Sequence, residues 1–539
     1  MNRETESHFS YLPDIDIRRS MFKRPHTHKT SLNAGDCVPI YVDSDILPGD
    51  TVKMNMGSLL RMQTPLFPVM DNAYCDLLFF FVPHRLVWDH WKEFWGENNL
   101  TAWEQQTEYT IPQITSPANT GWTSGTIADY MGIPTGVAGL SVNALPFRAY
   151  CKAWNDWLRD ENLKDPCMIT MDETTTTGAN SGDYVTYTEC GALPLKAAKY
   201  HDYFTSALVA PQKGPSVSIP LGTSAPIIGT DNIPSGTTLE SDLNGKQIFG
   251  YGVAGNVQFE NVDNTSQYLT NGKAIGMAAD LSAAIGTTIN QLRQSFAIQA
   301  FYEAQARGGS RYIEFIKNVF GVTSPDGRLQ RAEYLGGTRF NINMDQVLQT
   351  SATDNTSPQG NTAAFSCTVS TDEIFEHSFV EHGTLLGIAV VRTDHTYQQG
   401  IERMWSRKKF TDFYIPQFAN LGEQAILEQE IYATGQQNED EAVFGYQEAW
   451  ADYRYKQNRV SGYMRSNATG SLDVWHFADD YNSLPYYSDT WIQEPTSNVD
   501  RTIAVTSQLT HQFIGDFFFK CFYTRCMPVY SVPGLIDHV

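Results

Sequence analysis

One short segment, Asp76–Gly96, constrains the fold of this chain more than any other part of the sequence. Leu77–Val82 are apolar without interruption, so a strand at this position must be covered on both faces. Pro83 then ends the strand, because proline cannot donate to a strand ladder. Four large rings follow closely, at Trp88, Trp91, Phe94 and Trp95. Rings at this density are typical of a crowded core edge or of a buried protein–protein interface.

The composition favours a large buried core and argues against a protein that coats nucleic acid generally. Hydrophobic residues make up 41% and aromatic residues 12% of the 539 residues, whereas charged residues make up 18%. The formal net charge is -22, while binding to polyanions depends on clustered Lys and Arg. Nucleic acid is therefore expected to be a local partner at most.

The cysteines and the N-terminus indicate the compartment in which the chain folds. The eight cysteines are scattered without recurring close pairs, which argues against a disulfide scaffold. The first ten residues contain no apolar stretch of the kind found in signal peptides. No segment is long and apolar enough for a membrane span. We expect a soluble protein, without a membrane span, that is made in a reducing cytoplasm.

Strand patterns near both ends enclose helical patterns in the middle, which predicts a mainly β fold with long insertions. The expected strands are 38–42, 51–56, 77–82, 385–391, 410–415, 459–464 and 513–523. The expected helices are 147–158, 288–306 and 312–320, where apolar residues recur at helical spacing. Residues 211–280 differ from the rest, because they are rich in small polar residues and poor in charge. This tract is expected to be a surface excursion with its own short strands, and disorder is the alternative.

Motifs of catalysis and of metal binding are absent from the sequence. There is no phosphate-binding loop, GxGxxG, GxSxG, HExxH or paired CxxC. His26 and His28, and the Glu-His pairs at 376–377 and 381–382, are expected to be solvated or structural rather than metal ligands. No enzyme activity, cofactor or metal site is predicted, although a divalent cation is left open.

Three clusters of basic residues are candidates for contact with nucleic acid. The first lies in the N-terminal segment, the second is 403–409, and the third interleaves cations with rings that could stack on bases. Runs of basic residues are also common on surfaces where they are solvated or form salt bridges. This chain has a surplus of acidic residues that could pair with them. The candidates are Arg18, Arg19, Lys23, Arg24, Lys29, Arg454, Tyr455, Lys456 and Arg459.

Several long blocks of this sequence resemble the major capsid proteins of the Microviridae, small phages with single-stranded DNA, and especially their gokushovirus branch. The block FFFVPHRLVWDHW at 79–91 carries the likeness, and so does RPHTHKTSLNAGDCVPIYVDSDILPGD at 24–50. It continues in MGSLLRMQTPLFPVMD, in ARGGSRYIEFIKNVFGVTSPDGRLQRAEYLGG, in EHGTLLGIAVVR and in FKCFYTRCMPVYSVPG. Only 211–280 falls outside the resemblance.

The resemblance implies an eight-stranded antiparallel jelly roll whose copies close a T=1 icosahedral shell around circular single-stranded DNA. It divides the chain into a basic arm at 1–35, main strands at 36–90 and 371–539, insertions at 91–210 and 281–370, and a threefold protrusion at 211–280 for host attachment. The implied partners are further copies of the chain, the packaged DNA, a small basic DNA-binding virion protein, a pilot protein, transient scaffolding protein and a host-surface receptor. The implied locations are the virion and, during assembly, the host bacterial cytoplasm.

Within this frame, Leu77–Val82 is a strand of the jelly roll, and Trp88, Trp91, Phe94 and Trp95 are the candidate subunit interface. The rival interpretation is a β-sandwich carbohydrate-binding protein or glycosidase whose rings stack on sugars. A glycosidase would need two carboxylates flanking a cleft, roughly 5–10 Å apart. No motif in the sequence supports that arrangement.

Overall fold

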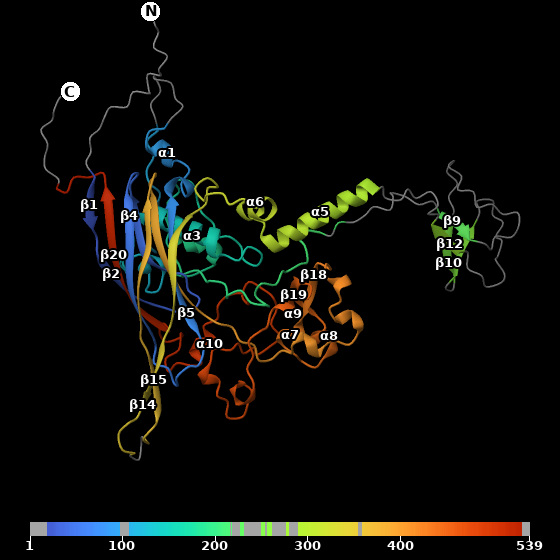
Figure 1. Ribbon diagram of the computed structural model, residues 1–539. Coiled ribbons are helices and arrows are strands. Elements are labelled where there is room, and N and C mark those ends of the chain that lie inside the picture. The colour runs from blue at the N-terminus through green and yellow to red at the C-terminus, as the bar shows by residue number, and fades with distance from the viewer. Residues whose placement is uncertain are drawn as a thin grey trace, which may run out of the picture. The chain divides into compact units, whose positions relative to one another are not determined.

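The computed structural model describes residues 19–97, 107–215, 217, 289–353 and 358–530, together with four short strands between 227 and 279. The chain divides into two compact units, one formed by 1–211 with 306–539 and the other by 212–305. In the larger unit, two antiparallel sheets lie against each other (Figure 1). Helices and irregular segments are inserted between their strands, so the fold is strand-rich with helical insertions.

The first sheet has five strands and joins segments from both ends of the sequence. Its strands are β1 (Ser20–Lys23), β2 (His26–Leu32), β20 (Phe513–Arg525), β4 (Thr51–Met62) and β16 (Thr368–Ser378). The order is β1-β20-β4-β16, and β2 also pairs with β20, beside β1. The prediction of an arm over residues 1–35 is therefore wrong from Ser20 onward. The long strand β20 offers backbone partners to this polar segment, and the His26 ring stacks on Phe519 with 5.1 Å between centroids.

The second sheet has four strands, and its two central strands are buried on both faces. Its order is β13 (Glu333–Asn341), β5 (Ala73–Pro83), β17 (Gly383–Thr393) and β3 (Val38–Ile46). Leu77, Phe79 and Phe81 belong to the core between the two sheets, whereas Phe80 and Val82 belong to a second core on the other face. The predicted coverage of both faces of 77–82 is thus confirmed. Strand β13 lies within the segment 281–370, for which we expected only helices and loops.

A helical layer covers the outer face of the second sheet. Its main element is α3 (Leu145–Ala153), which continues as a π-helix to Leu158, close to the predicted 147–158. Trp88, Phe147 and Trp154 fill the space between this layer and the sheet. Smaller elements complete the layer: α1 (Trp91–Phe94), β6 (Gln113–Thr115), α2 (Ile127–Tyr130), β7 (Ser141–Asn143), β8 (Thr176–Thr177) and α4 (Tyr184–Tyr187).

The insertion between β17 and β20 packs around a third core. It contains β18 (Glu423–Leu427), α7 (Glu428–Ile431), α8 (Gln437–Asp440), β19 (Val443–Glu448), α9 (Ala451–Arg454) and α10 (Ser497–Asp500). The strands predicted at 410–415 and 459–464 are wrong, because short 3-10 helices occupy Phe410–Asp412 and Gly462–Met464. Phe410 and Tyr463 are exposed there and do not point into a core, so these segments bury no apolar face of the kind that stabilises a strand in a sheet.

The helices predicted in the middle of the chain are present. They are α5 (Ile289–Gly308) and α6 (Tyr312–Phe320), and Gly321 ends α6 in the left-handed conformation at φ 68°. A hairpin of β14 (Met344–Leu348) and β15 (Thr362–Ser366) follows β13 and was not predicted. No helix among the described residues is long and apolar enough to cross a membrane.

The smaller unit has strands that pair only among themselves. β9 (Ile227–Thr230) pairs with β12 (Gly276–Ala279), and β10 (Phe249–Val253) pairs with β11 (Asn256–Glu260). The expectation that the tract 211–280 carries its own short strands is confirmed for these segments. The remaining residues of the tract beyond 217 lie outside the described residues.

A buried network of charges ties the 394–512 insertion to the end of β17. His395 lies between two carboxylates, with its Nδ1 3.0 Å from Asp479 and its Nε2 2.9 Å from Glu494. Lys199 donates to Asp479 at 3.2 Å. Burial disfavours the charged imidazole, but Asp479 and Glu494 outweigh it and raise the pKa of His395 to about 10. Burial likewise opposes the charge of Asp479, but Lys199 and His395 hold its pKa below the usual range.

This network predicts how the stability of the subunit depends on pH. The stabilisation that protonated His395 contributes to the folded state is complete below the pKa of about 6.5 that histidine has in the unfolded chain. It disappears as the pH rises towards 10, because the folded protein then releases this proton as well. His395→Asn should lower the free energy of unfolding by about 3–5 kcal/mol at pH 6, because two buried carboxylates lose their partner. Thermal unfolding of both proteins from pH 6 to pH 10 should show the difference shrinking. A constant difference would contradict this account.

Candidate nucleic-acid interface

The fold brings the second and third basic clusters of the sequence together at one surface. Arg407 forms an ion pair with Asp452, and its guanidinium lies 4.4 Å from the centre of the Tyr453 ring. The backbone N–H of Tyr414 donates to the Tyr453 hydroxyl at 3.3 Å. Segments 403–414 and 452–459 are therefore neighbours, although about forty residues separate them in sequence. We call the surface formed by 402–414 and 452–463 the aromatic–basic surface.

Large rings on the aromatic–basic surface face solvent to an unusual degree. A folded chain rarely exposes so many rings together unless something binds to them. Exposed rings beside cations are the arrangement that stacks bases of a single-stranded nucleic acid and contacts its phosphates. The exposed rings are Trp405, Phe410, Phe413, Tyr414, Tyr453, Tyr455 and Tyr463.

The predicted cations of this surface are exposed but engaged with carboxylates. Lys456 and Arg459 both reach Glu402, with Arg459 Nη1 3.3 Å from its carboxylate. Their side chains remain 66% and 70% exposed, so a phosphate could approach either one. One carboxylate leaves one of these two positive charges uncompensated. Arg454 pairs with Glu448, and the ring of Tyr455 is exposed beside it. Ion pairs this open contribute little to stability, so they can exchange for phosphate at low cost.

A small cavity of about 60 Å³ is lined by residues of this surface together with Tyr203 and Glu430. Glu430 is buried there, and it accepts hydrogen bonds from Tyr203 at 2.9 Å and from Arg403 at 3.4 Å. Burial raises the pKa of Glu430, and the charge of Arg403 opposes that rise. The carboxylates that line the cavity, Glu402, Glu430 and Asp452, are each engaged with a cation. They hold the chain in place and do not form the free acid pair that a glycosidase needs.

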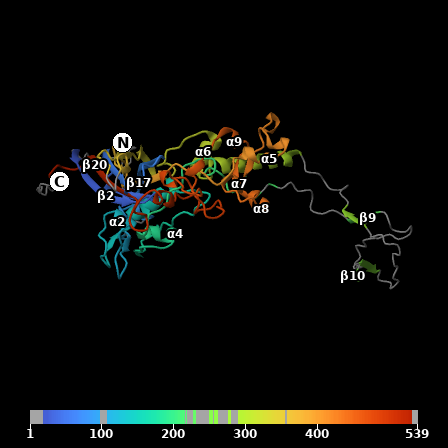
Figure 2. The same cartoon turned by 90° about the horizontal axis from the view of Figure 1, so that it is seen from below.

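The first basic cluster lies elsewhere. Figures 1 and 2 both show β2 at the opposite side of the larger unit from α7 and α9. Arg24 pairs with Asp43 at 2.6 Å and Lys29 with Asp516 at 3.1 Å. Arg19 and Lys23 also belong to the described part, next to and within β1, whereas Arg18 lies outside the described residues. The structure therefore places these side chains along a sheet edge and not on a free arm.

The four rings of the candidate subunit interface have different surroundings. Trp88 is completely buried in its own subunit, so its assignment to a subunit contact is wrong. Trp91 and Phe94 are half-buried against the same helical layer. Trp95 is 60% exposed and stacks on His382, with 4.7 Å between the ring centres. Trp95 is thus the ring of this group that is best placed to meet a neighbour.

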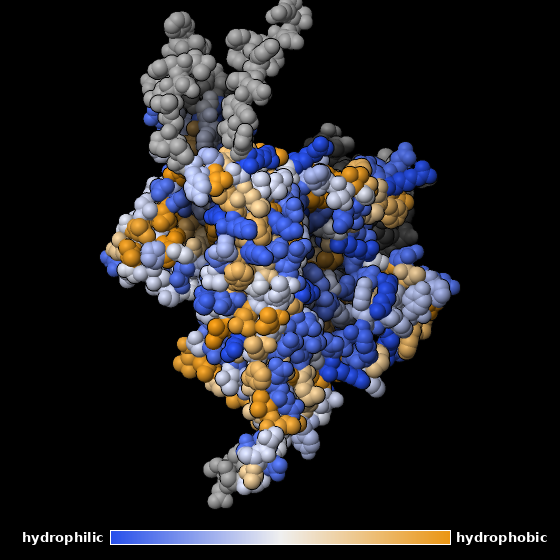
Figure 3. Space-filling model, turned by 60° about the vertical axis from the view of Figure 1, so that its left-hand side comes forward, coloured by the Kyte–Doolittle hydropathy of each residue, from blue (hydrophilic) through white to orange (hydrophobic). Residues whose placement is uncertain are grey.

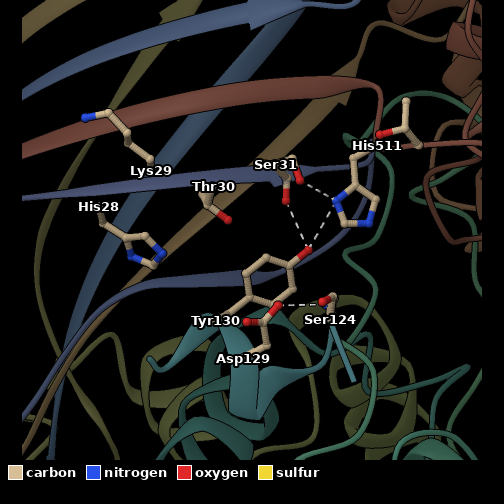
Figure 4. A pocket seen from close by; sticks show the side chains of 10 residues that line it. His28, Lys29, Thr30, Ser31, Ser124, Asp129, Tyr130 and His511 are labelled. Atoms are coloured by element: carbon tan, nitrogen blue, oxygen red, sulfur yellow. Dashed lines mark hydrogen bonds between the residues drawn. The ribbon is translucent and has the colours of Figure 1, made fainter. Parts of the chain in front are cut away.

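Figure 4 shows a larger pocket of about 540 Å³ at the free edge of β2. Its residues hydrogen-bond to one another: the Tyr130 hydroxyl donates to the backbone carbonyl of Ser31 at 3.0 Å, and Ser31 Oγ lies 2.8 Å from His511 Nδ1. Asp129 accepts from the Gly125 N–H at 2.8 Å. Sequence reasoning missed this pocket because its walls come from 28–31, 124–130 and 510–511. Within the described ranges, no group of three or more His, Cys, Asp or Glu could hold a metal ion.

Two facing antiparallel sheets with helical insertions define a strand-rich protein, and its described residues include a surface of exposed rings and cations. The chain belongs to the family described as Capsid protein (F protein), which matches residues 10–535. It is 42% identical to Capsid protein VP1 of Spiroplasma virus 4 over 98% of this chain and 97% of that protein. It is also 42% identical to Capsid protein VP1 of Bdellovibrio phage phiMH2K, over 99% and 98% of the two chains. For Capsid protein VP1 of Chlamydia phage 1 the identity is 38%, over 98% of both.

These relationships settle the class of the protein. It is a non-enzymatic capsid protein of the Microviridae, with relatives of the gokushovirus type, and a component of the virion. A capsid protein works as one of many copies in a shell that packages the genome. The resemblance drawn from the sequence blocks is confirmed.

The shared carboxylate on the aromatic–basic surface leads to a prediction about DNA binding. Glu402→Gln should release Lys456 and Arg459 for phosphate and steepen the dependence of affinity on salt by about one phosphate contact. The double variant Lys456→Gln with Arg459→Gln should weaken binding and flatten the same dependence. Titration of purified subunits with labelled poly-dT, at salt concentrations from about 50 to about 200 mM, measures the slope of affinity against salt for each variant.

The matched control for this titration is Lys92→Gln with Lys520→Gln, which removes two exposed lysines outside this surface. Equal slopes for all four proteins would assign Lys456 and Arg459 to ordinary surface pairing.

Proposed function

We propose that this chain is the repeating subunit of a T=1 icosahedral shell that encloses circular single-stranded DNA. The observation that carries the proposal is the match to the capsid family over residues 10–535, on a chain whose two sheets form one continuous core. Closed symmetry turns repeated contacts between copies into a cooperative shell. Obligate interfaces of this kind commonly bury on the order of 2,000–5,000 Å².

The strand order supports an eight-stranded jelly roll as the architecture of the subunit. β1 and β2 occupy successive parts of the same edge beside β20, so each sheet has four strand positions. Numbering the eight strand positions in chain order, from β2 to β20, places 1, 8, 3 and 6 in one sheet and 2, 7, 4 and 5 in the other. This alternation between two facing sheets is the double Greek key of viral jelly rolls.

The aromatic–basic surface supports a contact with the packaged DNA. Its rings are exposed, and its cations lie in pairs that open easily, as a loosely held and sequence-tolerant contact requires. The net charge of -22 fits a shell that meets DNA only at such local surfaces. A small basic virion protein that accompanies the DNA would supply the remaining neutralisation. A pilot protein and a transient scaffolding protein complete the proposed set of assembly partners.

Electron microscopy of the expressed chain tests the shell. Co-expression with its small basic partner should give closed particles of one size, because copies of one subunit form one set of contacts. The variant Trp95→Ala, which lacks a candidate interface ring, provides a reference for weakened assembly. A protein that stays monomeric at micromolar concentration and cleaves glycosides would support the rival β-sandwich interpretation instead.

The tract 211–280 is proposed as the threefold protrusion that meets the host. Support comes from the separate compact unit at 212–305 and from its two strand pairs, β9 with β12 and β10 with β11, neither of which pairs with a described strand of the larger unit. Thr, Ser, Asn and Tyr there can hydrogen-bond a glycan or a surface protein of the bacterium at little packing cost.

Deletion separates this role from the shell itself. Replacing 211–280 with a short Gly/Ser linker should leave particle yield near that of the original chain, because the core between the sheets is untouched. The same particles should lose adsorption to host cells, measured by depletion of particles from the medium. Adsorption that survives the deletion would place attachment on another part of the particle.

A further inference from the structure

The hairpin of β14 and β15 extends beyond the two sheets without support from a third strand. The two strands pair with each other, and neither pairs with another strand of the described chain. Figure 1 shows this ribbon projecting from the lower end of the sheets. An isolated two-stranded ribbon is marginally stable in water, so a projecting one needs a surface to pack against.

The register of the hairpin separates a supported face from an open one. Met344, Ala364 and Ser366 lie on one face, where Met344 packs against the core and the other two are buried. On the other face, Phe365 and Val347 are 49% and 45% exposed. Side chains of a strand alternate between faces, so this open face carries apolar groups that are about half exposed.

The open face continues onto the outer face of the first sheet. Val369 follows Phe365 on the same side of the chain, is 71% exposed, and pairs directly with Leu59 of β4. Ile514 of β20 adds to the surface and is 49% exposed. Figure 3 shows apolar surface on this side above the projecting ribbon. We call the set Val347, Phe365, Val369, Leu59 and Ile514 the apolar stripe.

Two opposite charges accompany the apolar stripe. Asp345 lies directly opposite Phe365 in the hairpin, and Arg61 lies directly opposite Ile514 in the sheet. Both are exposed. Neither side chain has an ion pair or a hydrogen bond to any residue that the structure describes. One surface therefore presents an apolar strip together with an acid and a base that are both available to a partner.

We propose that the apolar stripe is a contact between copies of this chain, in which Asp345 of one copy pairs with Arg61 of the next. A surface that carries both members of a charge pair is complementary to another copy of itself. The same surface of two copies can therefore meet across a twofold axis, where Asp345 of each copy faces Arg61 of the other. Burial of the Phe365 ring and of the aliphatic groups of the stripe supplies the driving force. The inference rests on the proposed shell, since it names one contact from which that shell is built.

Charge reversal tests the pairing between copies. Asp345→Arg and Arg61→Asp should each lower the yield of closed particles by at least about tenfold, because each places like charges across every repeated contact. The double variant restores opposite charges and the original net charge, and should return the yield to within about threefold of the original chain. Particle yield is measured by sedimentation and electron microscopy after co-expression with the small basic partner.

Thermal unfolding of unassembled subunits separates a contact between copies from one within a copy. The midpoint should agree within about 2 °C for all four proteins, because the two residues have no partner in their own subunit. A midpoint that falls in both single variants and recovers in the double variant would assign the pair to one subunit and overturn the inference. Single variants that assemble normally, or a double variant that fails to recover, would also overturn it. If the original chain itself forms no particles, the proposed shell fails instead.

Discussion

The fold of this capsid protein depends on the second sheet, whose two central strands are buried on both faces. β5 and β17 sit in its middle, and their side chains alternate between the core shared with the first sheet and the core under the helical layer. Neither layer can be removed without exposing a continuous apolar strand to water, which costs roughly 25 cal/mol for each Å² exposed. The insertion that covers the outer face of these strands is therefore part of the core.

The sequence predicted those parts of the fold whose signal is local. Leu77–Val82 identified a doubly buried strand, and helical spacing identified 147–158, 288–306 and 312–320. Strand β13 was missed because its side chains alternate only weakly and its glycines read as a loop. β1 and β2 were missed because edge strands can be polar, and only the distant β20 makes them strands. At 410–415 and 459–464, aromatic residues produced a strand-like sequence pattern, although in the folded chain they belong to an exposed surface.

The candidate sites divide in the same way. Residue types identified the cations and rings at 454–459, but only the folded chain shows that 403–414 lies beside them and that Glu402 holds two of the cations. Trp88 shows the limit of the argument from composition, because interface rings and core rings are the same residues. Asp345 and Arg61 carry no sequence signal at all. Only the strand register identifies them as contact candidates, because it places each one opposite an exposed apolar side chain.

The pairing of β1 and β2 with β20 joins residues 20–32 to residues 513–525. During synthesis the early strands must wait for almost five hundred further residues before their partner exists, which is the order of sequence separation that slows folding most. Chains that stop before β20 keep an open sheet edge and an uncovered core. Completion of the core between the sheets therefore depends on a strand that is synthesised long after the strands it pairs with.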